Sequence, residues 1–446
     1  RHTSRQNGTA SLSKGYQYSD SFQSLRAFQL NKDKRVRVEP HSLTANNNVI
    51  LRAFTNITTM SFSVYESYVA LCNNERVIMH DIDNNTENTI ILPDLESERK
   101  IDVHNKVDIE TYHMITSLAF SEDGKYFAVC TNRKQLCLYE TKDLKLLSNR
   151  TLIRAASRVR FSSNNDIVIA DKAGDAYLFS TSCPTEAGTF ILGHLSMLLD
   201  VLVTQDMKYV LTTDRDEKIR VSMFPNCYNI ISYCLGHEKF VTNISELPHE
   251  KSILISCGGD GVFKLWDYKC GSELMSVNFY DKISKCDIER FNQDLRDCQY
   301  DESVDILPVK YLRVYYFSKI ESLIIISFYS SKILLVYKIS GDKNTQLKAN
   351  YLESITVETE PIECLLHKQD LWVLTDVGLR VFKFDNDRFV THDALNSTIK
   401  CLNTSWKILK NTIVKRNLFP VLYKRKYDNV QEYQERKKIR LAGNTE

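Results

Sequence analysis

Residues 193–222, GHLSMLLDVLVTQDMKYVLTTDRDEKIRVS, decide the fold of this chain. The stretch opens on Gly193-His194, turn signals divide it into three short strands, and an alternating apolar and polar run over 219–222 ends it. The same layout follows at once, from Gly236-His237 to Trp266-Asp267. Corresponding residues recur after roughly 40–45 positions, so we interpret the stretch as one unit of a repeat.

A Gly-His start, a Trp-Asp end and this period are typical of one blade of a WD-type β-propeller. One unit carries the full Trp-Asp pair, and the others are recognised by their period-two strands. Seven such units predict an all-β fold, a seven-bladed WD40-type β-propeller whose closed ring leaves no long exposed edge. Their final alternating runs end at Met79, Tyr139, Phe179, Ser222, Trp266, Tyr337 and Phe382.

The sequence predicts three regions. Residues 1–45 are polar and basic and are expected to form a flexible, disordered N-terminal arm. Residues 46–412 are expected to form the propeller, with a polar link over roughly 85–112 and an insertion at 272–308 that could hold a short helix around 288–295. Residues 413–446 are expected to form a basic C-terminal helix or tail, because good helix formers and Lys/Arg residues dominate there.

Composition excludes several classes of protein. The formal net charge of the 446 residues is +2, so any attraction for nucleic acid must come from local patches. The 12 cysteines form no Cys-x2-Cys pair, and several stand in apolar runs, so we expect buried thiols in a reducing compartment. The first residues lack the apolar segment of a secretory signal, and the most apolar span, 323–337, is interrupted by polar residues. We therefore expect neither a secretory signal nor a membrane span.

No enzyme motif emerges from the sequence, so catalytic residues, cofactor-binding residues and metal ligands are all predicted to be absent. Residues 81–85 resemble the start of a calcium loop, but Thr86 stands where Gly is needed and Leu92 where Glu is needed. His194 and His237 could be catalytic bases; we favour a structural role, in which the His of a blade bonds an Asp of the next tight turn. The predicted structural residues are His237, Ser256, Asp260 and Trp266 in one blade and His194, Thr212 and Asp216 in the blade before it.

Residues 214–220 read Asp-Arg-Asp-Glu-Lys-Ile-Arg and form the most unusual part of the repeat. Strand alternation places Lys218 and Arg220 on one face and Ile219 on the other. Such a run is often only a solvated edge. It can also hold itself in shape by internal ion pairs and offer a cation to an acidic group of a partner.

The two stretches around the Gly-His pairs, with the run Asp-Arg-Asp-Glu-Lys-Ile-Arg-Val-Ser at 214–222, closely resemble one family. This family is the non-catalytic WD-repeat subunit of the tRNA (guanine-N7)-methyltransferase. The preceding blade, over 169–177, and the tail around Tyr427-Asp428-Asn429-Val430 agree with it. The resemblance is strong over about 155–280, whereas the first 45 residues and the length of the insertion do not match.

The resemblance implies a scaffold that pairs with a separate catalytic tRNA (guanine-N7)-methyltransferase subunit. That partner would bind S-adenosylmethionine, so no cofactor is expected on this chain, and it would methylate N7 of a guanine in the variable loop of tRNA. The scaffold would stabilise the catalytic subunit, help to position the tRNA, and reside in the nucleus and possibly also the cytoplasm. The resemblance assigns partner binding to Asp214, Arg215, Glu217, Lys218 and Arg220, with Glu217 expected to steady Arg220.

The basic tail is the candidate contact with tRNA phosphates, which would position the tRNA without reading its sequence. The alternatives are a contact with the partner or a solvated helix. The candidate residues are Lys424, Arg425, Lys426, Arg436, Lys437 and Lys438.

The main rival function is a generic WD-repeat adaptor, such as a substrate receptor of a ubiquitin ligase. Those adaptors usually carry Trp-Asp-x-Arg at the end of a blade, whereas Trp266-Asp267-Tyr268 is followed here by Lys269. An enzyme in its own right would need a catalytic cluster, and the sequence offers none.

Overall fold

The computed structural model describes residues 62–72, 76–94, 115–298, 300, 302–410 and 422–423. The chain divides into two compact units, residues 1–52 and 53–446, and all described residues belong to the second. The predicted N-terminal arm and the six basic tail residues, from Lys424 to Lys438, therefore lie outside the described residues.

The described residues form seven four-stranded antiparallel sheets, and each sheet uses four strands that are consecutive in the chain. Sheet one holds β1 (Phe62–Tyr65), β2 (Tyr68–Cys72), β3 (Arg76–Asp81) and β4 (Thr86–Ile91). Sheet two holds β5 (Ile115–Phe120), β6 (Tyr126–Thr131), β7 (Gln135–Glu140) and β8 (Leu146–Thr151). Sheet three holds β9 (Ala156–Phe161), β10 (Ile167–Asp171), β11 (Asp175–Phe179) and β12 (Thr189–Gly193). Sheet four holds β13 (Leu198–Val203), β14 (Tyr209–Asp214), β15 (Ile219–Met223) and β16 (Ile230–Cys234).

The remaining three sheets complete the set. Sheet five holds β17 (Val241–Leu247), β18 (Glu250–Gly258), β19 (Val262–Asp267) and β20 (Ser272–Asn278). Sheet six holds β21 (Val309–Ser318), β22 (Glu321–Phe328), β23 (Ile333–Ser340) and β24 (Lys348–Thr356). Sheet seven holds β25 (Glu363–His367), β26 (Asp370–Leu374), β27 (Leu379–Asp385) and β28 (Arg388–Thr391).

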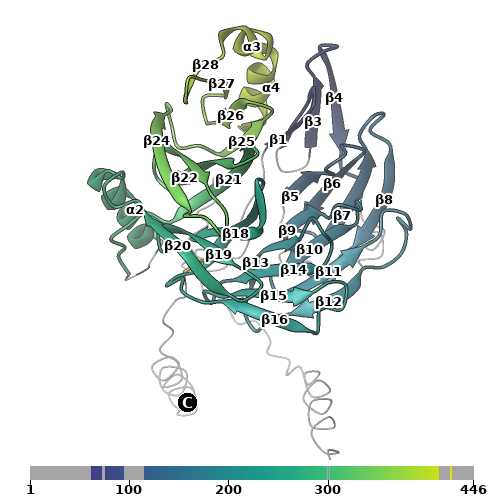
Figure 1. Cartoon of the computed structure of the whole chain (residues 1–446). Coiled ribbons are helices and arrows are strands. Elements are labelled where there is room, and N and C mark those ends of the chain that lie inside the picture. Colours follow the sequence, from purple (N-terminus) through teal and green to yellow (C-terminus); the bar gives the residue numbers. More distant parts are fainter. Residues whose placement is uncertain are drawn as a thin grey trace, which may run out of the picture. The chain divides into compact units, whose positions relative to one another are not determined.

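The seven sheets are the blades of a closed propeller (Figure 1). The first strand of each blade contacts the first strand of the next, in the order β1, β5, β9, β13, β17, β21 and β25, and β25 returns to β1. Packing between the faces of neighbouring blades buries the apolar side chains of the second and third strands. The seven-bladed WD40-type fold predicted from strand periodicity is therefore confirmed.

The fourth strand of each blade was not recognised from the sequence, which indicated three strands per unit. Two of these strands lie in segments that were predicted otherwise: β4 lies in the supposed polar link, and β20 lies in the supposed insertion at 272–308. The reason is exposure. Most residues of β4 and β20 face solvent at the outside of the ring, so these strands carry no apolar alternation to reveal them.

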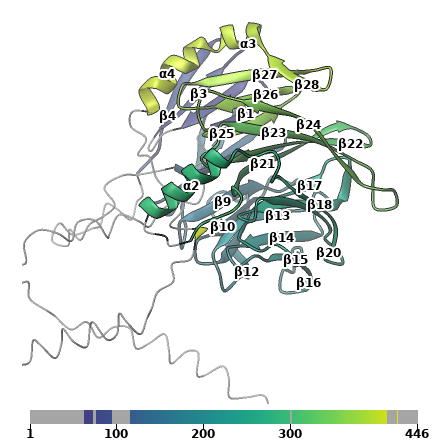
Figure 2. The same cartoon turned by 90° about the vertical axis from the view of Figure 1, so that its left-hand side faces the viewer.

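The rest of the insertion contains α2 (Lys285–Asp297), close to the helix expected around 288–295. The side chain of Ser284 caps its N-terminus by accepting a hydrogen bond from the backbone N–H of Cys286. Phe291 and Leu295 turn inward and join the apolar core of sheets five and six, and Figure 2 shows the helix outside the strands that it covers.

Two helices follow the last blade, α3 (Asp393–Thr398) and α4 (Lys400–Lys410). All four described strands of blade seven come from one stretch of chain, so among the described residues no exchanged strand joins blade seven to blade one. Instead, the fully buried Trp406 of α4 joins an apolar cluster that contains Leu71 of blade one and Trp372 of blade seven. The indole N–H of Trp406 donates to the backbone oxygen of Thr375 at 2.9 Å, so α4 seals the junction of the two blades.

None of the helices in the described part of the chain is long and apolar enough to cross a membrane.

Candidate docking surface

The propeller has two rims, and the candidate site lies on the rim where the chain passes from one blade to the next. We call this the entry rim. It carries the loops between blades, such as 193–197 and 235–240, together with the turns that join the second and third strand of each blade, such as 171–175 and 214–218. The other rim, which we call the opposite rim, carries the remaining turns.

In blade five, His237 makes the network expected of a WD blade. Its Nδ1 lies 2.7 Å from Oδ2 of Asp260, and its Nε2 lies 2.7 Å from the hydroxyl of Ser256. The indole N–H of Trp266 donates to the same hydroxyl at 2.8 Å. The histidine, the serine and the tryptophan are all buried, so the network holds the loop to the blade and offers no accessible base for catalysis.

Blade four departs from the prediction at one residue. His194 contacts Thr212 through Nε2 at 2.8 Å, as expected, but its Nδ1 pairs with Asp214 at 3.0 Å and not with Asp216. The sequence favoured Asp216 because Asp216 corresponds to Asp260 of blade five, whereas the position that corresponds to Asp214 is Gly258. Asp214 is the last residue of β14 and contacts the histidine directly, whereas Asp216 lies two residues further along the turn.

The released Asp216 instead binds the loop that precedes the blade. Its Oδ1 accepts a hydrogen bond from the hydroxyl of Ser196 at 2.8 Å. The backbone N–H of Arg215 donates to the oxygen of Met197 at 3.0 Å. Asp214 fixes the turn itself, because its Oδ1 accepts from the backbone N–H groups of Asp216 and Lys218. Loop 193–197 and turn 214–218 therefore form one rigid unit.

Blade three supports this unit from the other side. The backbone N–H of His194 donates to the oxygen of Gly174 at 2.8 Å. Gly174 has a φ of +106°, and a Cβ there would lie 2.5 Å from the oxygen of His194 and 2.6 Å from that of Ser196. Glycine is required at this position both by its backbone conformation and by this close approach.

Arg220, which the resemblance assigns to partner binding, is half-buried and is held by groups of its own chain. Its guanidinium donates to the hydroxyl of Ser222 at 2.9 Å and to the backbone oxygens of Gly193 at 3.1 Å and Cys227 at 3.0 Å. Glu217, which was expected to steady Arg220, forms no ion pair with it in the described part of the chain. Arg220 is thus a positioning residue that ties the strand to loop 193–197.

The exposed groups of the rigid unit are both charged and apolar. Glu217 and Lys218 are exposed at the tip of the turn. Leu195 is fully exposed in the adjoining loop, and Leu235 is 63% exposed. Ile219 pairs with Cys234 between β15 and β16, and Lys218 and Leu235 are the next residues beyond this pair. We call Leu195, Glu217, Lys218 and Leu235 the docking surface; its two leucines were missed because a single exposed leucine leaves no periodic signal.

The described end of the tail also lies on the entry rim. Tyr423 is buried, with its ring centroid 5.3 Å from that of Phe240 in the loop before blade five. It also contacts Phe291 of α2, with ring centroids 6.2 Å apart. Tyr423 therefore anchors the chain to the propeller, and Lys424 follows it in the sequence.

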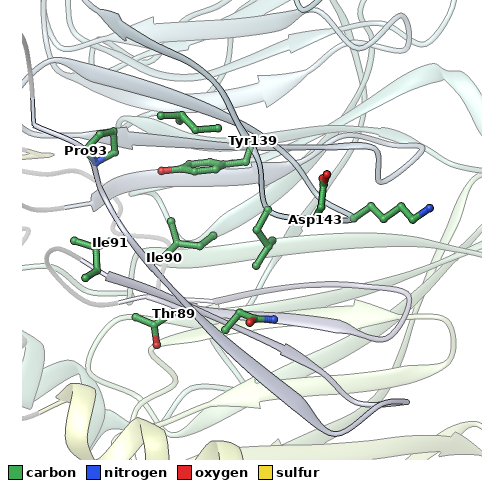
Figure 3. Close-up of a pocket in the computed structure, with 10 residues that line it drawn as sticks. Thr89, Ile90, Ile91, Pro93, Tyr139 and Asp143 are labelled. Atoms are coloured by element: carbon green, nitrogen blue, oxygen red, sulfur yellow. The ribbon is translucent and has the colours of Figure 1, made fainter.

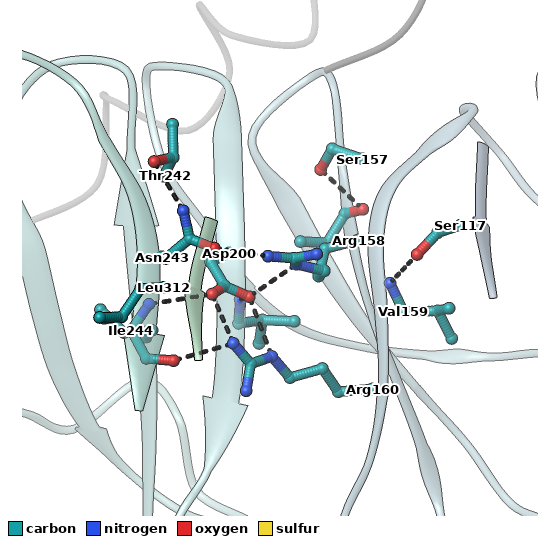
Figure 4. A network of polar contacts seen from close by, with 12 residues as sticks. Ser117, Ser157, Arg158, Val159, Arg160, Asp200, Thr242, Asn243, Ile244 and Leu312 are labelled. Atoms are coloured by element: carbon teal, nitrogen blue, oxygen red, sulfur yellow. Dashed lines mark hydrogen bonds and ion pairs between the residues drawn. The ribbon is translucent and has the colours of Figure 1, made fainter. Parts of the chain in front are cut away.

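A charged network in the centre of the ring escaped the sequence analysis (Figure 4). Arg158 and Arg160 on β9 both donate to Asp200 on β13, with N–O distances of 3.0 and 2.5 Å in the closest ion pairs. Arg160 also donates to the backbone oxygen of Ile244 on β17. Burial alone would raise the pKa of Asp200, but the two arginines outweigh it and hold the pKa below its usual value. The network joins three blades and is structural.

Two hollows among the described residues carry no catalytic constellation. One, of about 430 Å³, lies between β4 and the outer strands of blade two and is lined mainly by Ile90, Ile91, Pro93 and Tyr139 (Figure 3). The other lies on the opposite rim. No group of three or more His, Cys, Asp or Glu side chains that could hold a metal ion occurs among the residues that the structure describes.

Comparison with known proteins identifies close similarities. A family model described as the tRNA methyltransferase TRM82 WD40 domain matches residues 31–187 and 180–377. The tRNA (guanine-N(7)-)-methyltransferase non-catalytic subunit WDR4 of Homo sapiens is 31% identical over 329 residues, which are 72% of this chain and 75% of the relative. The corresponding subunit of Danio rerio is 31% identical over 337 residues, covering 73% and 77%. That of Xenopus laevis is 45% identical over 165 residues, covering 36% and 42%.

Solved structures share the fold at low sequence identity. A chain in the "Crystal Structure of Mitotic Checkpoint Complex" aligns with a TM-score of 0.55 and 14% identity, covering 79% of this chain and all of that one. The "Structure of U3-55K" aligns with a TM-score of 0.53 and 13% identity, covering 72% and 90%. These similarities support the propeller fold alone.

Proposed function

This chain belongs to the tRNA methyltransferase TRM82 WD40 family, and from this premise we propose that it stabilises a catalytic tRNA (guanine-N7)-methyltransferase subunit and helps to position tRNA on it. The relatives are non-catalytic subunits, and this chain is likewise a non-enzymatic component. S-adenosylmethionine would be held by the catalytic subunit, and the complex would act in the nucleus.

The observation that carries the proposal is the rigidity of the docking surface. Hydrogen bonds from His194, Ser196 and Arg220 hold loop 193–197 against turn 214–218 before any partner arrives. A pre-ordered surface loses little conformational entropy on binding, so more of its contact energy appears as affinity. Two exposed leucines beside a lysine suit a partner surface that offers an apolar recess with an acidic rim.

The tail would serve the tRNA. Tyr423 lies on the same rim as the docking surface, and the basic residues follow it in the sequence from Lys424 onward. Cations there would neutralise phosphates close to the active centre of the partner.

The direct test is co-purification. The tagged chain should bring down a methyltransferase, and the eluate should transfer methyl groups from S-adenosylmethionine to guanine N7 of tRNA, whereas the chain alone should not. Failure of any methyltransferase to co-purify would contradict the proposal and favour a generic WD-repeat adaptor.

A second test concerns the tail. Removing residues 424–446 should weaken tRNA binding by the complex and flatten its salt dependence, because fewer counterions are released. The affinity between the two subunits serves as the control. An unchanged salt slope would remove the tail from the tRNA site.

A further inference from the structure

A cavity on the opposite rim, between blades four and five, lies outside the docking surface. Its volume is about 480 Å³, within the range typical of ligand sites. Gln205 and Asp206 from the turn after β13, Glu246 from β17, and Tyr268 after β19 contribute to its lining. The other lining residues of the cavity are Glu250, Lys251, Ser252 and Lys269.

Glu246 distinguishes this cavity from an ordinary surface hollow. Only 9% of the residue is exposed, and its Oε2 accepts a hydrogen bond from the backbone N–H of Gln205 at 2.9 Å. No described residue donates a hydrogen bond to its other oxygen, Oε1. Burial raises the pKa of Glu246, which means that the ionised form lacks part of the compensation that water would supply.

The other two carboxylates of the cavity are already engaged. Asp206 accepts hydrogen bonds from the hydroxyl of Thr204 at 2.7 Å and from the backbone N–H of Lys208 at 3.1 Å. Glu250 accepts from the hydroxyl of Ser252 at 2.5 Å and from its N–H at 3.1 Å. Of the three carboxylates, Glu246 is the one that is buried, and its Oε1 accepts no hydrogen bond from a described residue.

Tyr268 closes the floor of the cavity. It is 2% exposed and packs edge to face on Tyr209, with ring centroids 5.9 Å apart. A planar cation that can donate two parallel hydrogen bonds to a carboxylate is the guanidinium of arginine.

The lysines at the mouth of the cavity indicate which residues can stand next to the arginine. Lys251 and Lys269 are exposed at the mouth of the cavity and would repel a segment with several cations. They would attract an acidic residue next to the arginine. We propose that this cavity binds a linear peptide of a partner protein by inserting an arginine side chain onto Glu246, with a neighbouring acidic residue of the peptide facing Lys251 and Lys269.

The site is separate from the docking surface. The strands of blades four and five that connect the two rims have about six residues, which corresponds to roughly 20 Å. The inference therefore does not rest on the proposed function, and an arginine peptide and the catalytic subunit should bind this chain at the same time.

The test uses the full chain and the peptide acetyl-Gly-Arg-Glu-Gly-amide, observed by saturation-transfer difference NMR and titrated to obtain a dissociation constant. The same peptide with citrulline in place of arginine keeps the shape and removes the charge. We expect binding of the arginine peptide and at least about tenfold weaker binding of the citrulline peptide.

Glu246→Gln should weaken binding of the arginine peptide by a similar factor. A glutamine can still accept the hydrogen bond from the backbone N–H of Gln205, but it carries no charge. Glu122→Gln removes the same charge from an exposed turn of blade two and should leave binding unchanged. Lys251→Ser should weaken binding of this peptide several-fold but not binding of acetyl-Gly-Arg-Ala-Gly-amide. No binding to the unmodified chain, equal binding of the citrulline peptide, or equal losses in the Glu246 and Glu122 variants would overturn the proposal.

Discussion

At the scale of single residues, Asp214 shows how one side chain can stabilise both a turn and a loop. One of its oxygens accepts from two backbone N–H groups of the turn, and the other pairs with His194. Blade five uses a different arrangement. Asp260 pairs with His237, and glycines stand at positions 258 and 259. The two blades thus reach the same loop geometry with carboxylates at different positions.

This difference can be measured by mutation. Asp214→Ala should destabilise the chain by about 2–3 kcal/mol, because it leaves buried hydrogen-bond donors unpaired. Asp216→Ala loses the contact with Ser196 and should cost about 1 kcal/mol. Urea unfolding of both variants gives the comparison. A larger loss for Asp216 would restore the assignment made from the sequence.

Substitutions of Lys218 and Arg220 should have different effects, because Lys218 is exposed and Arg220 is hydrogen-bonded within the chain. Lys218→Glu should weaken association with the catalytic subunit by about 1–3 kcal/mol without changing the stability of the isolated chain. Arg220→Leu should weaken association and lower the stability together, since it releases the oxygens of Gly193 and Cys227. Calorimetric titration and thermal melts distinguish the two effects.

Lys208→Glu supplies the matched control. Lys208 is exposed on the opposite rim, so reversing its charge changes the net charge equally but leaves the docking surface intact. Equal losses of affinity for the Lys208 and Lys218 variants would show that general electrostatic attraction, and not docking at Lys218, explains the effect.

At the scale of elements, α4 takes the place of a strand exchanged between the first and last blades. Its apolar face joins a cluster that contains residues of both blades, and its exposed face carries Ile408, which is 69% exposed. The ring is therefore closed by side-chain packing between the blades and under a helix. This arrangement concentrates the stability of the closure on a few large side chains.

Trp406→Ala should accordingly destabilise the propeller by about 3–5 kcal/mol, because it leaves a large cavity and removes the hydrogen bond to Thr375. Ile408→Ala, on the same helix, should change the stability by no more than about 0.5 kcal/mol. Hydrogen exchange should show the loss of protection first in β1–β4 and β25–β28. Protection lost evenly over all seven blades would contradict a local role for α4 in the closure.

At the scale of the whole molecule, the central charged network links blades three, four and five through Asp200. Breaking a buried ion pair from one side leaves uncompensated charge, so Asp200→Asn should cost about 3–5 kcal/mol at neutral pH. The variant leaves the guanidinium groups of both Arg158 and Arg160 without their carboxylate partner. A loss below about 1 kcal/mol would mean that water replaces the carboxylate without cost.

The stability should also depend on pH in a defined direction. Burial lowers the pKa of His80 and of His367, so stability should begin to fall as the pH drops below about 6.5, where the unfolded chain takes up protons first. The lowered pKa of Asp200 adds a second loss below about pH 4. Melting temperatures between pH 3 and 8 would test this, and Asp200→Asn should flatten only the acidic limb. Parallel profiles for the variant and the unmodified chain would contradict the assignment.

The sequence by itself determined the repeat, the number of blades and the network around His237. These features depend on alternation within a strand and on spacing between neighbouring segments, both of which a linear sequence records. The non-catalytic role was expected from the run at 214–222, which resembles the family, and the relatives confirm it.

Only the tertiary structure decided which groups of that run are available to a partner. Arg220 is turned inward by backbone oxygens of Gly193 and Cys227, and His194 selects Asp214 over Asp216. The helical closure at Trp406, the ion pairs of Asp200 and the cavity at Glu246 likewise join residues that are about 30 or more positions apart. Such contacts depend on how blades pack against one another, and hydrophobic periodicity reports that a side chain is buried but not which partner it meets.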